Sequence, residues 1–283
     1  MSGRRIHQFI YYTHTPLVLL AMVLTGTISA VLYHTITWQV ILLVGLSTYL
    51  TYSLDNLFDW TKDKSHYENI ERLIQSYHKI TYILIPGAAI GIFFLVLHSS
   101  NELRTGILLL GAAVAMSTTR FSNYRENSTQ DSKKLFGFFL NRLFISLIWT
   151  TVCVFLPIWY NNLQIMPLTW HTFLYMYFLI LSYAIIWKLE KSETALQKRF
   201  FTSKIPSILA FLPIFSMFLV GYDILIGIAP LINLVNLAPA IACLVGIIRI
   251  SQNPFNLKSK ISLLTIILIV LCSLSAAVHL LLG

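Results

Sequence analysis

The chain has 283 residues, of which 57% are hydrophobic and only 11% are charged, and its formal net charge is +9. An ordinary soluble domain carries roughly 25% charged residues, so this chain cannot cover a water-exposed surface with solvated groups. Its mean hydropathy of +0.73 excludes a disordered chain, and its three cysteines form no CxxC pair, which excludes a zinc or redox motif. An all-α, polytopic membrane protein remains.

Nine apolar segments follow one another along the chain, each close to the ~20 residues that cross a bilayer as a helix. Helices are expected because backbone groups in lipid must be satisfied within the segment, and no stretch alternates as a membrane-barrel strand does. The expected spans are residues 10–33, 36–57, 79–97, 103–120, 135–157, 168–188, 205–221, 223–248 and 261–282. No soluble second domain is visible, so residues 1–283 are expected to form a single transmembrane domain.

The basic residues predict the orientation of these spans. Nineteen of the twenty Lys and Arg residues fall on one side of a nine-span chain, and only Arg104 falls on the other. By the positive-inside rule the N-terminus is cytoplasmic and the C-terminus is outside. The same rule and anionic membrane lipids account for the net charge, so no nucleic-acid partner is expected, although some cations are left as candidates for holding an anionic substrate. The expected location is a bacterial inner membrane, with multiple spans.

The densest acidic cluster follows the second span. If the helix continues through it, Asp55, Asn56, Asp59 and Asp63 lie within an arc of about 100°. Carboxylates spaced in this way repel one another, and a divalent cation reverses that repulsion. Magnesium is commonly held by one or two carboxylates while substrate phosphates and water complete its shell. The cluster therefore predicts a magnesium–phosphate site, and the alternative is a solvated helix end whose acids pair with neighbouring lysines.

A second polar segment follows the sixth span. On a helix, Glu190, Glu193 and Gln197 fall within about 60° of one another, so they also share a face. Taken alone, this basic stretch is typical of a solvated loop with local ion pairs. Asp223, between the seventh and eighth expected spans, is interpreted as a turn residue on the outer side.

The order of these features resembles the UbiA-type membrane prenyltransferase superfamily. Three elements carry the likeness: Asp55-Asn56-x-x-Asp59-x-x-x-Asp63, Asn69-x-x-Arg72 and Lys133-Lys134-Leu135. The first is similar to the family motif N-D-x-x-D-x-x-x-D with its leading pair inverted. The second is similar to a downstream Asn-Arg element, and the third to the lysine-led start of the fifth helix. The resemblance implies nine helices around a central cavity that opens to the bilayer.

The resemblance also implies an activity, which is magnesium-dependent transfer of an isoprenoid chain from a prenyl diphosphate to a lipophilic acceptor. It implies that Asp59 and Asp63 are catalytic and that the metal ligands are Asp55, Asn56, Asp59, Asp63, Glu190 and Glu193. The candidates for contacting the diphosphate are Asn56, Arg72, Arg125, Lys134 and Lys191. Aromatic faces stabilise a developing allylic cation, and the candidates for this role are Tyr183 and Trp187, with Tyr52 and Phe58 near the first motif.

The second motif departs from the family pattern. It has Glu190 and Glu193 where two aspartates four residues apart are expected, and Arg72 is followed by leucine where the family has proline. Binding of a single metal, a different substrate and lost activity are therefore left open. The alternative functions are a relative that binds an isoprenoid or lipid, or that acts as a membrane assembly partner. A transporter is disfavoured because charged residues avoid the span centres.

Overall fold

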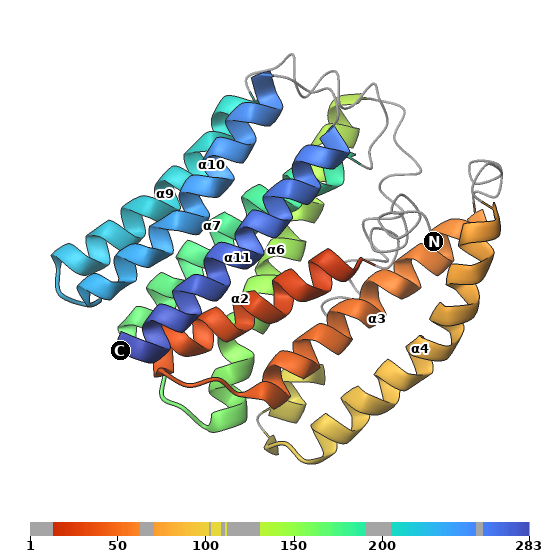
Figure 1. Cartoon of the computed structure of the whole chain (residues 1–283), viewed down its shortest axis with the longest axis horizontal. Coiled ribbons are helices and arrows are strands. Elements are labelled where there is room, and N and C mark those ends of the chain that lie inside the picture. The colour runs from red at the N-terminus through yellow and green to blue at the C-terminus, as the bar shows by residue number, and fades with distance from the viewer. Residues whose placement is uncertain are drawn as a thin grey trace.

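The computed structural model of the chain is a bundle of helices (Figure 1). It describes residues 14–62, 71–101, 103–108, 111, 131–190, 205–252 and 257–282. Within these ranges the backbone alone is described for residues 55–62, 71–80, 131–136, 138, 188–190, 205, 208 and 257–259. Every regular element in this part of the chain is helical, which confirms the expected all-α class.

The described helices overlap the expected spans. They are α2 (Thr15–Tyr33), α3 (Trp38–Lys62), α4 (Glu71–Leu97), α6 (Asp131–Asn161), α7 (Pro167–Glu190), α9 (Ile205–Leu225), the 3-10 helix η2 (Leu231–Asn236), α10 (Leu237–Gln252) and α11 (Leu257–Leu282). Five helical segments are long and apolar enough to cross a membrane: Thr15–Tyr33, Phe139–Asn161, Pro167–Trp187, Leu231–Gln252 and Lys260–Leu282. Three shorter apolar segments are Trp38–Leu54, Thr81–Leu97 and Leu209–Leu225. Of the expected span 103–120, residues 103–108 and 111 are described, and they are helical.

Large apolar side chains cover the outside of the bundle. On α4, Ile83 is 74% exposed and Phe93 is 60% exposed, and on α9 the values for Phe211 and Phe218 are 68% and 62%. In water such a surface would drive association, whereas in a bilayer it meets lipid tails. The outward faces therefore agree with the composition in indicating a membrane protein.

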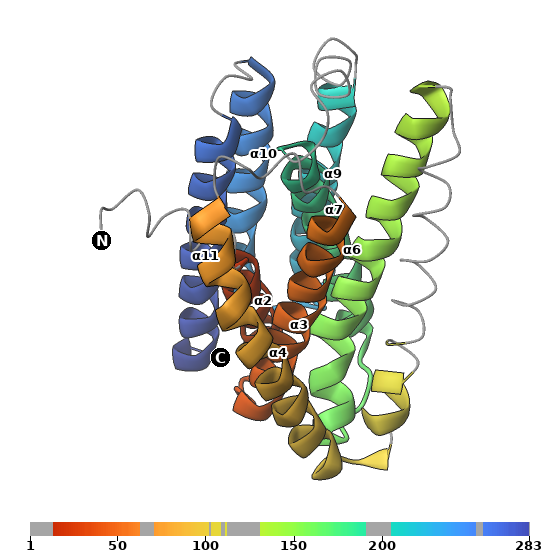
Figure 2. The ribbon, with the colours of Figure 1, turned by 90° about the vertical axis from the view of Figure 1, so that its right-hand side faces the viewer.

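Helix α7 lies at the centre of the bundle. It packs against α6 and α9 most extensively, and also against α10, α11 and α2. Helix α2 packs between α11 and α3, while α3 carries α4 on its far side, as Figures 1 and 2 show. The main core, which includes Leu20 and Ile28 of α2 and Ile186 of α7, joins these inner helices, and a smaller core around Val44 and Leu156 joins α3 to α2 and α6.

Hydrogen bonds between helix termini define one end of the bundle, which we call the hairpin end. The bonds join Asn161 to Thr37 at 2.9 Å, Ser100 to Trp159 at 3.1 Å and His34 to His279 at 3.2 Å. They gather the ends of α2, α4, α6 and α11 with the start of α3. Since the chain reverses there between α2 and α3 and between α6 and α7, α3 and α7 both run away from this end. We call the opposite end, where α3 ends at Lys62 and α7 ends at Glu190, the motif end.

The boundary after the seventh expected span differs from the sequence prediction. Helix α9 continues through Asp223 to Leu225, and the backbone amides of Ile228 and Ala229 donate to the Asp223 carbonyl at 2.9 and 3.0 Å. The chain then turns at Gly227, whose φ of +73° favours glycine. The interpretation of Asp223 as a turn residue is wrong, because this acid is helical and only 5% exposed.

Candidate functional site

Helix α3 carries the first acidic motif toward the motif end. Its backbone is helical through Asp55, Asn56 and Asp59, so the helix continues into the motif as expected. The helical period then places these three positions within an arc of about 100°. Their side chains, and the whole of Asp63, lie outside the described residues.

Tyr52 shows which way the motif face of α3 is turned. By the helical period it lies within about 60° of each of the three motif positions that follow it. Its half-buried ring meets Trp149 of α6 edge-on, with ring centroids 6.1 Å apart, and lies 5.1 Å from the ring of His14, the residue that precedes α2. The Tyr52 side of α3 is therefore turned toward α2 and α6, while Thr51, which lies within about 40° of Asp55 by the same period, is exposed.

Three buried hydroxyl groups belong to the same part of the bundle. Ser53 lies beside Tyr52 on α3, Ser146 lies three residues before Trp149 on α6, and Thr81 lies on α4. Each is at most 1% exposed, and its hydroxyl has no hydrogen-bond partner within the part of the chain that the structure describes. Because an unpartnered buried hydroxyl is costly, these groups have unused capacity to bind a polar ligand.

Helix α7 brings the second motif to the same end as the first. Its backbone is helical as far as Glu190, while the Glu190 side chain, Lys191 and Glu193 lie outside the described residues. Arg72 and Lys134 fall in the first turns of α4 and α6, also at the motif end, with backbone alone described. With α3, these helices bring the backbone of six predicted site positions to one end of the bundle: Asp55, Asn56, Asp59, Arg72, Lys134 and Glu190.

Arg125 falls outside the described residues. So do the side chains of all the predicted magnesium ligands. Among the side chains that the structure does describe, no three His, Cys, Asp or Glu residues gather as metal ligands would. The predicted magnesium site therefore stays a prediction.

The two aromatic residues predicted near the second motif are packed into the core. Tyr183 is 4% exposed and Trp187 is 5% exposed, and their ring centroids lie 5.9 Å apart, as expected from their spacing of four residues. The Tyr183 hydroxyl lies 2.7 Å from the Thr265 hydroxyl of α11. Since Thr265 donates its own hydrogen to the Ile261 carbonyl, Tyr183 is the donor of this bond. The pair joins α7 to α11.

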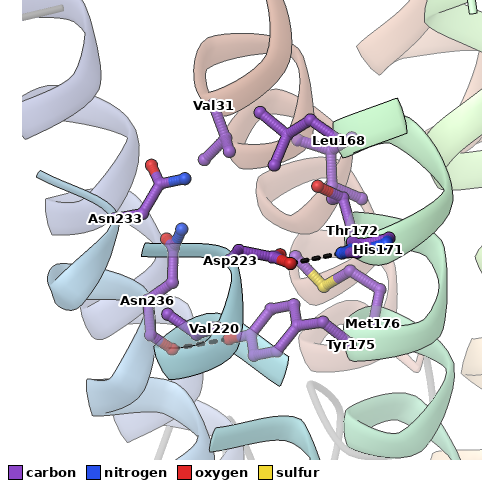
Figure 3. Close-up of a pocket in the computed structure, with 11 residues that line it drawn as sticks. Val31, Leu168, His171, Thr172, Tyr175, Met176, Val220, Asp223, Asn233 and Asn236 are labelled. Atoms are coloured by element: carbon purple, nitrogen blue, oxygen red, sulfur yellow. Dashed lines mark hydrogen bonds and ion pairs between the residues drawn. The ribbon is translucent and has the colours of Figure 1, made fainter. Parts of the chain in front are cut away.

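Sequence analysis missed a polar cluster at the hairpin end, which Figure 3 shows. We call it the hairpin-end cluster, and it consists of His171, Thr172 and Tyr175 from α7, Asp223 from α9, and Asn233 and Asn236 from η2. The His171 ring nitrogen Nδ1 donates to Asp223, and the Tyr175 hydroxyl donates to the Asn236 carbonyl at 2.7 Å. These two bonds join three helical elements.

Helix α11 completes the cluster from behind. The Ser275 hydroxyl donates to the Asn236 side-chain oxygen at 2.5 Å, and His279 Nε2 lies 2.6 Å from the Asn233 side-chain oxygen. His279 Nδ1 donates to the Ser275 carbonyl at 2.8 Å, so in a neutral ring Nε2 carries no hydrogen and accepts. The roles of donor and acceptor in the contact between Nε2 and the Asn233 side chain therefore depend on the histidine tautomer and on the amide orientation.

The hairpin-end cluster surrounds a cavity of about 20 Å³. The rest of its wall is apolar and includes Ile28 and Val31 of α2 and Val220 of α9. A cavity of this size has room for about one water molecule. The sequence signal for this cluster is a set of polar residues, such as His171 and Asp223, within or beside otherwise apolar segments. Polar and ionisable residues in such segments are rare and often have a function.

Comparisons with known proteins returned nothing similar to this chain: no protein-family model, curated protein or solved structure matches it. The likeness to prenyltransferases is therefore carried by the motif residues of the chain itself. Those residues and the geometry of the two ends of the bundle are the evidence that bears on function.

Proposed function

We propose that the chain is a magnesium-dependent intramembrane prenyltransferase, which moves an isoprenoid chain from a prenyl diphosphate to a lipophilic acceptor. The observation that carries this proposal is the orientation of α3. Tyr52 packs inward against Trp149, and the helical period places Asp55 and Asp59 on the same face within the next two turns. An acidic helix face on the inward side of the bundle would suit a bound cation better than a solvated helix end.

The proposed topology has nine spans around a central cavity in a bacterial inner membrane, with the N-terminus inside and the C-terminus outside. The motif end is then the cytoplasmic end, where nineteen of the twenty basic residues are expected. The five long apolar helical segments and three shorter ones of the described chain support a multi-pass protein. A diphosphate would reach the motif end from the cytoplasm while its isoprenoid chain stays in lipid.

The acidic positions fit a divalent cation because, without one, three carboxylates on one helix face repel one another. Those that would hold it are Asp55, Asn56, Asp59, Asp63, Glu190 and Glu193. Magnesium held there would neutralise the charge of the leaving diphosphate, which is metal-assisted catalysis. Arg72, Arg125, Lys134 and Lys191 would contact the phosphate oxygens, with the arginines able to do so through two parallel hydrogen bonds.

The allylic carbon–oxygen bond breaks with its electron pair leaving on the diphosphate, so a cation develops in the apolar interior. An aromatic face stabilises such a cation. Of the aromatic candidates, Tyr52 and its neighbour Trp149 are half-buried, whereas Tyr183 and Trp187 are buried in the core, where the Tyr183 hydroxyl bonds to Thr265 of α11. We assign the prenyl-facing role to Tyr52 and a positioning role to Tyr183.

The test uses the purified full-length protein in nanodiscs with radiolabelled polyprenyl diphosphates, magnesium and a panel of lipophilic acceptors. The expected result is a labelled lipid product that forms with magnesium and stops when a chelator removes it. Asp59→Asn combined with Asp63→Asn should abolish this transfer. The absence of any magnesium-dependent product, or a product that survives this double substitution, would overturn the proposal.

A second candidate function is binding of an isoprenoid or lipid without transfer, as an altered family relative or assembly partner. The observation that favours it is the burial of Tyr183 and Trp187, which fixes the end of α7 to α11 instead of leaving these rings at a ligand. Calorimetry separates the two functions, because tight binding of a prenyl diphosphate without turnover belongs to the second.

A further inference from the structure

Four side chains of the hairpin-end cluster are more than nine-tenths buried and still keep an unused hydrogen-bonding group. They are Asn233, Asp223, Asn236 and Thr172, which are 4%, 5%, 7% and 8% exposed. Asp223 uses one carboxylate oxygen to accept from His171, and Asn236 uses its side-chain oxygen to accept from Ser275. Within the described chain, no partner is present for the second Asp223 oxygen, the amide nitrogens of Asn233 and Asn236, or the Thr172 hydroxyl.

These unused groups surround one small space. Thr172 projects from α7, Asp223 from α9 and Asn236 from η2, and Figure 3 shows the three side chains around the same opening. The cavity volume of about 20 Å³ admits about one atom group of the size of water. These residues are largely buried, and a polar occupant of the space would satisfy the groups that have no partner in the described chain.

The hydrogen-bonding pattern selects the chemistry of this occupant. A carboxylate oxygen needs a donor, whereas an amide nitrogen needs an acceptor, and a hydroxyl group supplies both. An ammonium or metal cation would satisfy Asp223 but would face the amide hydrogens of Asn236. A phosphate or carboxylate would satisfy Asn236 but would be repelled by Asp223.

We infer that the cavity is a hydroxyl-binding site, in which one O–H group donates to Asp223 and accepts from Asn236, with Thr172 as a third contact. The hydroxyl belongs to a bound water or to the alcohol headgroup of a membrane lipid. The apolar wall formed by Ile28, Val31 and Val220 suits the first carbons of such a lipid. The inference is independent of the proposed prenyl transfer.

The first arm of the experiment detects water. The full-length protein is placed in nanodiscs of phosphatidylcholine, a lipid without a free hydroxyl group, and its structure is determined at a resolution that shows ordered water. The expected result is a single peak about 3 Å from both Asp223 and the Asn236 amide. Because this lipid has no hydroxyl group, such a peak excludes a lipid alcohol, and distances of about 3 Å to its neighbours assign it to water.

The second arm detects a lipid alcohol. A long-chain primary alcohol bearing a photoreactive group is added to the same nanodiscs, and labelled peptides are identified after irradiation. Binding through the hydroxyl predicts saturable labelling of α7 or η2 that an unlabelled alcohol competes and its methyl ether does not, because the ether cannot donate to Asp223. Labelling of this kind assigns the site to a lipid.

Two variants remove the contacts within the cavity, and one serves as a control. Asn236→Leu removes the amide, and Thr172→Val removes a hydroxyl with almost no change of shape, which keeps the test available if the first variant fails to fold. Each should reduce occupancy or labelling by roughly threefold to tenfold. Asn161→Leu makes the same change at the same end but outside the cavity, and should have no effect.

Either a water peak without saturable labelling or hydroxyl-dependent labelling supports the inference and names the source of the hydroxyl. An empty cavity, together with equal labelling by the alcohol and its ether, overturns it. Full occupancy in both cavity variants overturns it as well.

Discussion

Buried polar groups differ in their hydrogen-bond partners between the two ends of the bundle. At the hairpin end, His171, Asp223 and Asn236 each have a partner from another helix, and the groups left over surround a space of hydroxyl size. At the motif end, the Ser53 and Ser146 hydroxyls have no partner in the described chain. Polar groups that satisfy one another stabilise a fold, whereas unsatisfied ones keep their capacity for a ligand. The contacts at the hairpin end are therefore mainly structural, and the motif end is where we propose the chemistry.

The largest effect should come from the motif end. Asp59→Asn with Asp63→Asn keeps the shape of both side chains but removes two charges from the proposed metal site, so prenyl transfer should fall by at least about a hundredfold. The thermal unfolding midpoint should stay within about 2 °C of the parent protein, because repulsion between acids is relieved. Product formation and unfolding are measured on the same preparations.

Asp131→Asn is the matched control, since Asp131 begins α6 at the same end but is not a proposed ligand. It should retain activity within about twofold. Equal losses in the control and the double variant would mean that any acid at this end matters, which would break the assignment of the motif.

The next effect should appear at the hairpin end, in stability and not in transfer. Asp223→Leu leaves His171 without its carboxylate partner and should lower the free energy of unfolding by about 2–3 kcal/mol. This is less than for a fully enclosed pair because the His171 side chain is 28% exposed. Transfer at the motif end should remain within about twofold.

A double-mutant cycle isolates the pair itself. Asp223→Leu combined with His171→Leu should cost less than the sum of the single variants, because the second change removes the group that the first one leaves unpartnered. Additive costs would show that the two residues act separately, and the hairpin end would then lose its central structural contact.

A smaller effect on transfer should follow Tyr52→Leu. Loss of an aromatic face near a developing cation should lower the turnover number by about fivefold to tenfold. Tyr52→Phe keeps the face and should restore most of the rate, measured by product formation at saturating diphosphate. A loss in the phenylalanine variant equal to that in the leucine variant would assign the role to the hydroxyl and not to the ring.

Much of the fold could be predicted from the sequence because helix length and apolar content are local properties. The sequence predicts the all-α class and the continuation of the helix through Asp59. It also predicts that Tyr183 and Trp187 share a face. Helices α4 and α6 extend beyond their expected spans, starting at Glu71 and Asp131, since polar turns continue a helix past the apolar segment.

The partners of buried polar groups could not be predicted, because they depend on contacts between distant helices. Asp223 meets His171, which lies 52 positions earlier, and Asn236 meets Ser275, 39 positions later. An acid between two apolar runs has the same local sequence whether it is a solvated turn or a buried partner. For the same reason, the spacing of Tyr183 and Trp187 predicts a common face, but not that this face packs against α11, since α7 is apolar on all sides.

The smallest effect is expected for Tyr183→Phe, which tests whether Tyr183 contributes to stability or to prenyl transfer. The change removes the 2.7 Å bond to Thr265, but the Thr265 hydroxyl still donates to the Ile261 carbonyl, so no donor is left unsatisfied. The cost should be only about 0.6–1 kcal/mol, or roughly 2 °C in the unfolding midpoint, with transfer unchanged. Tyr177→Phe, on the same helix, is the control and should change neither quantity. A tenfold loss of transfer without a change in unfolding would instead make Tyr183 a residue of the prenyl site, and the aromatic positioning contact between α7 and α11 would have to be reassigned to the chemistry.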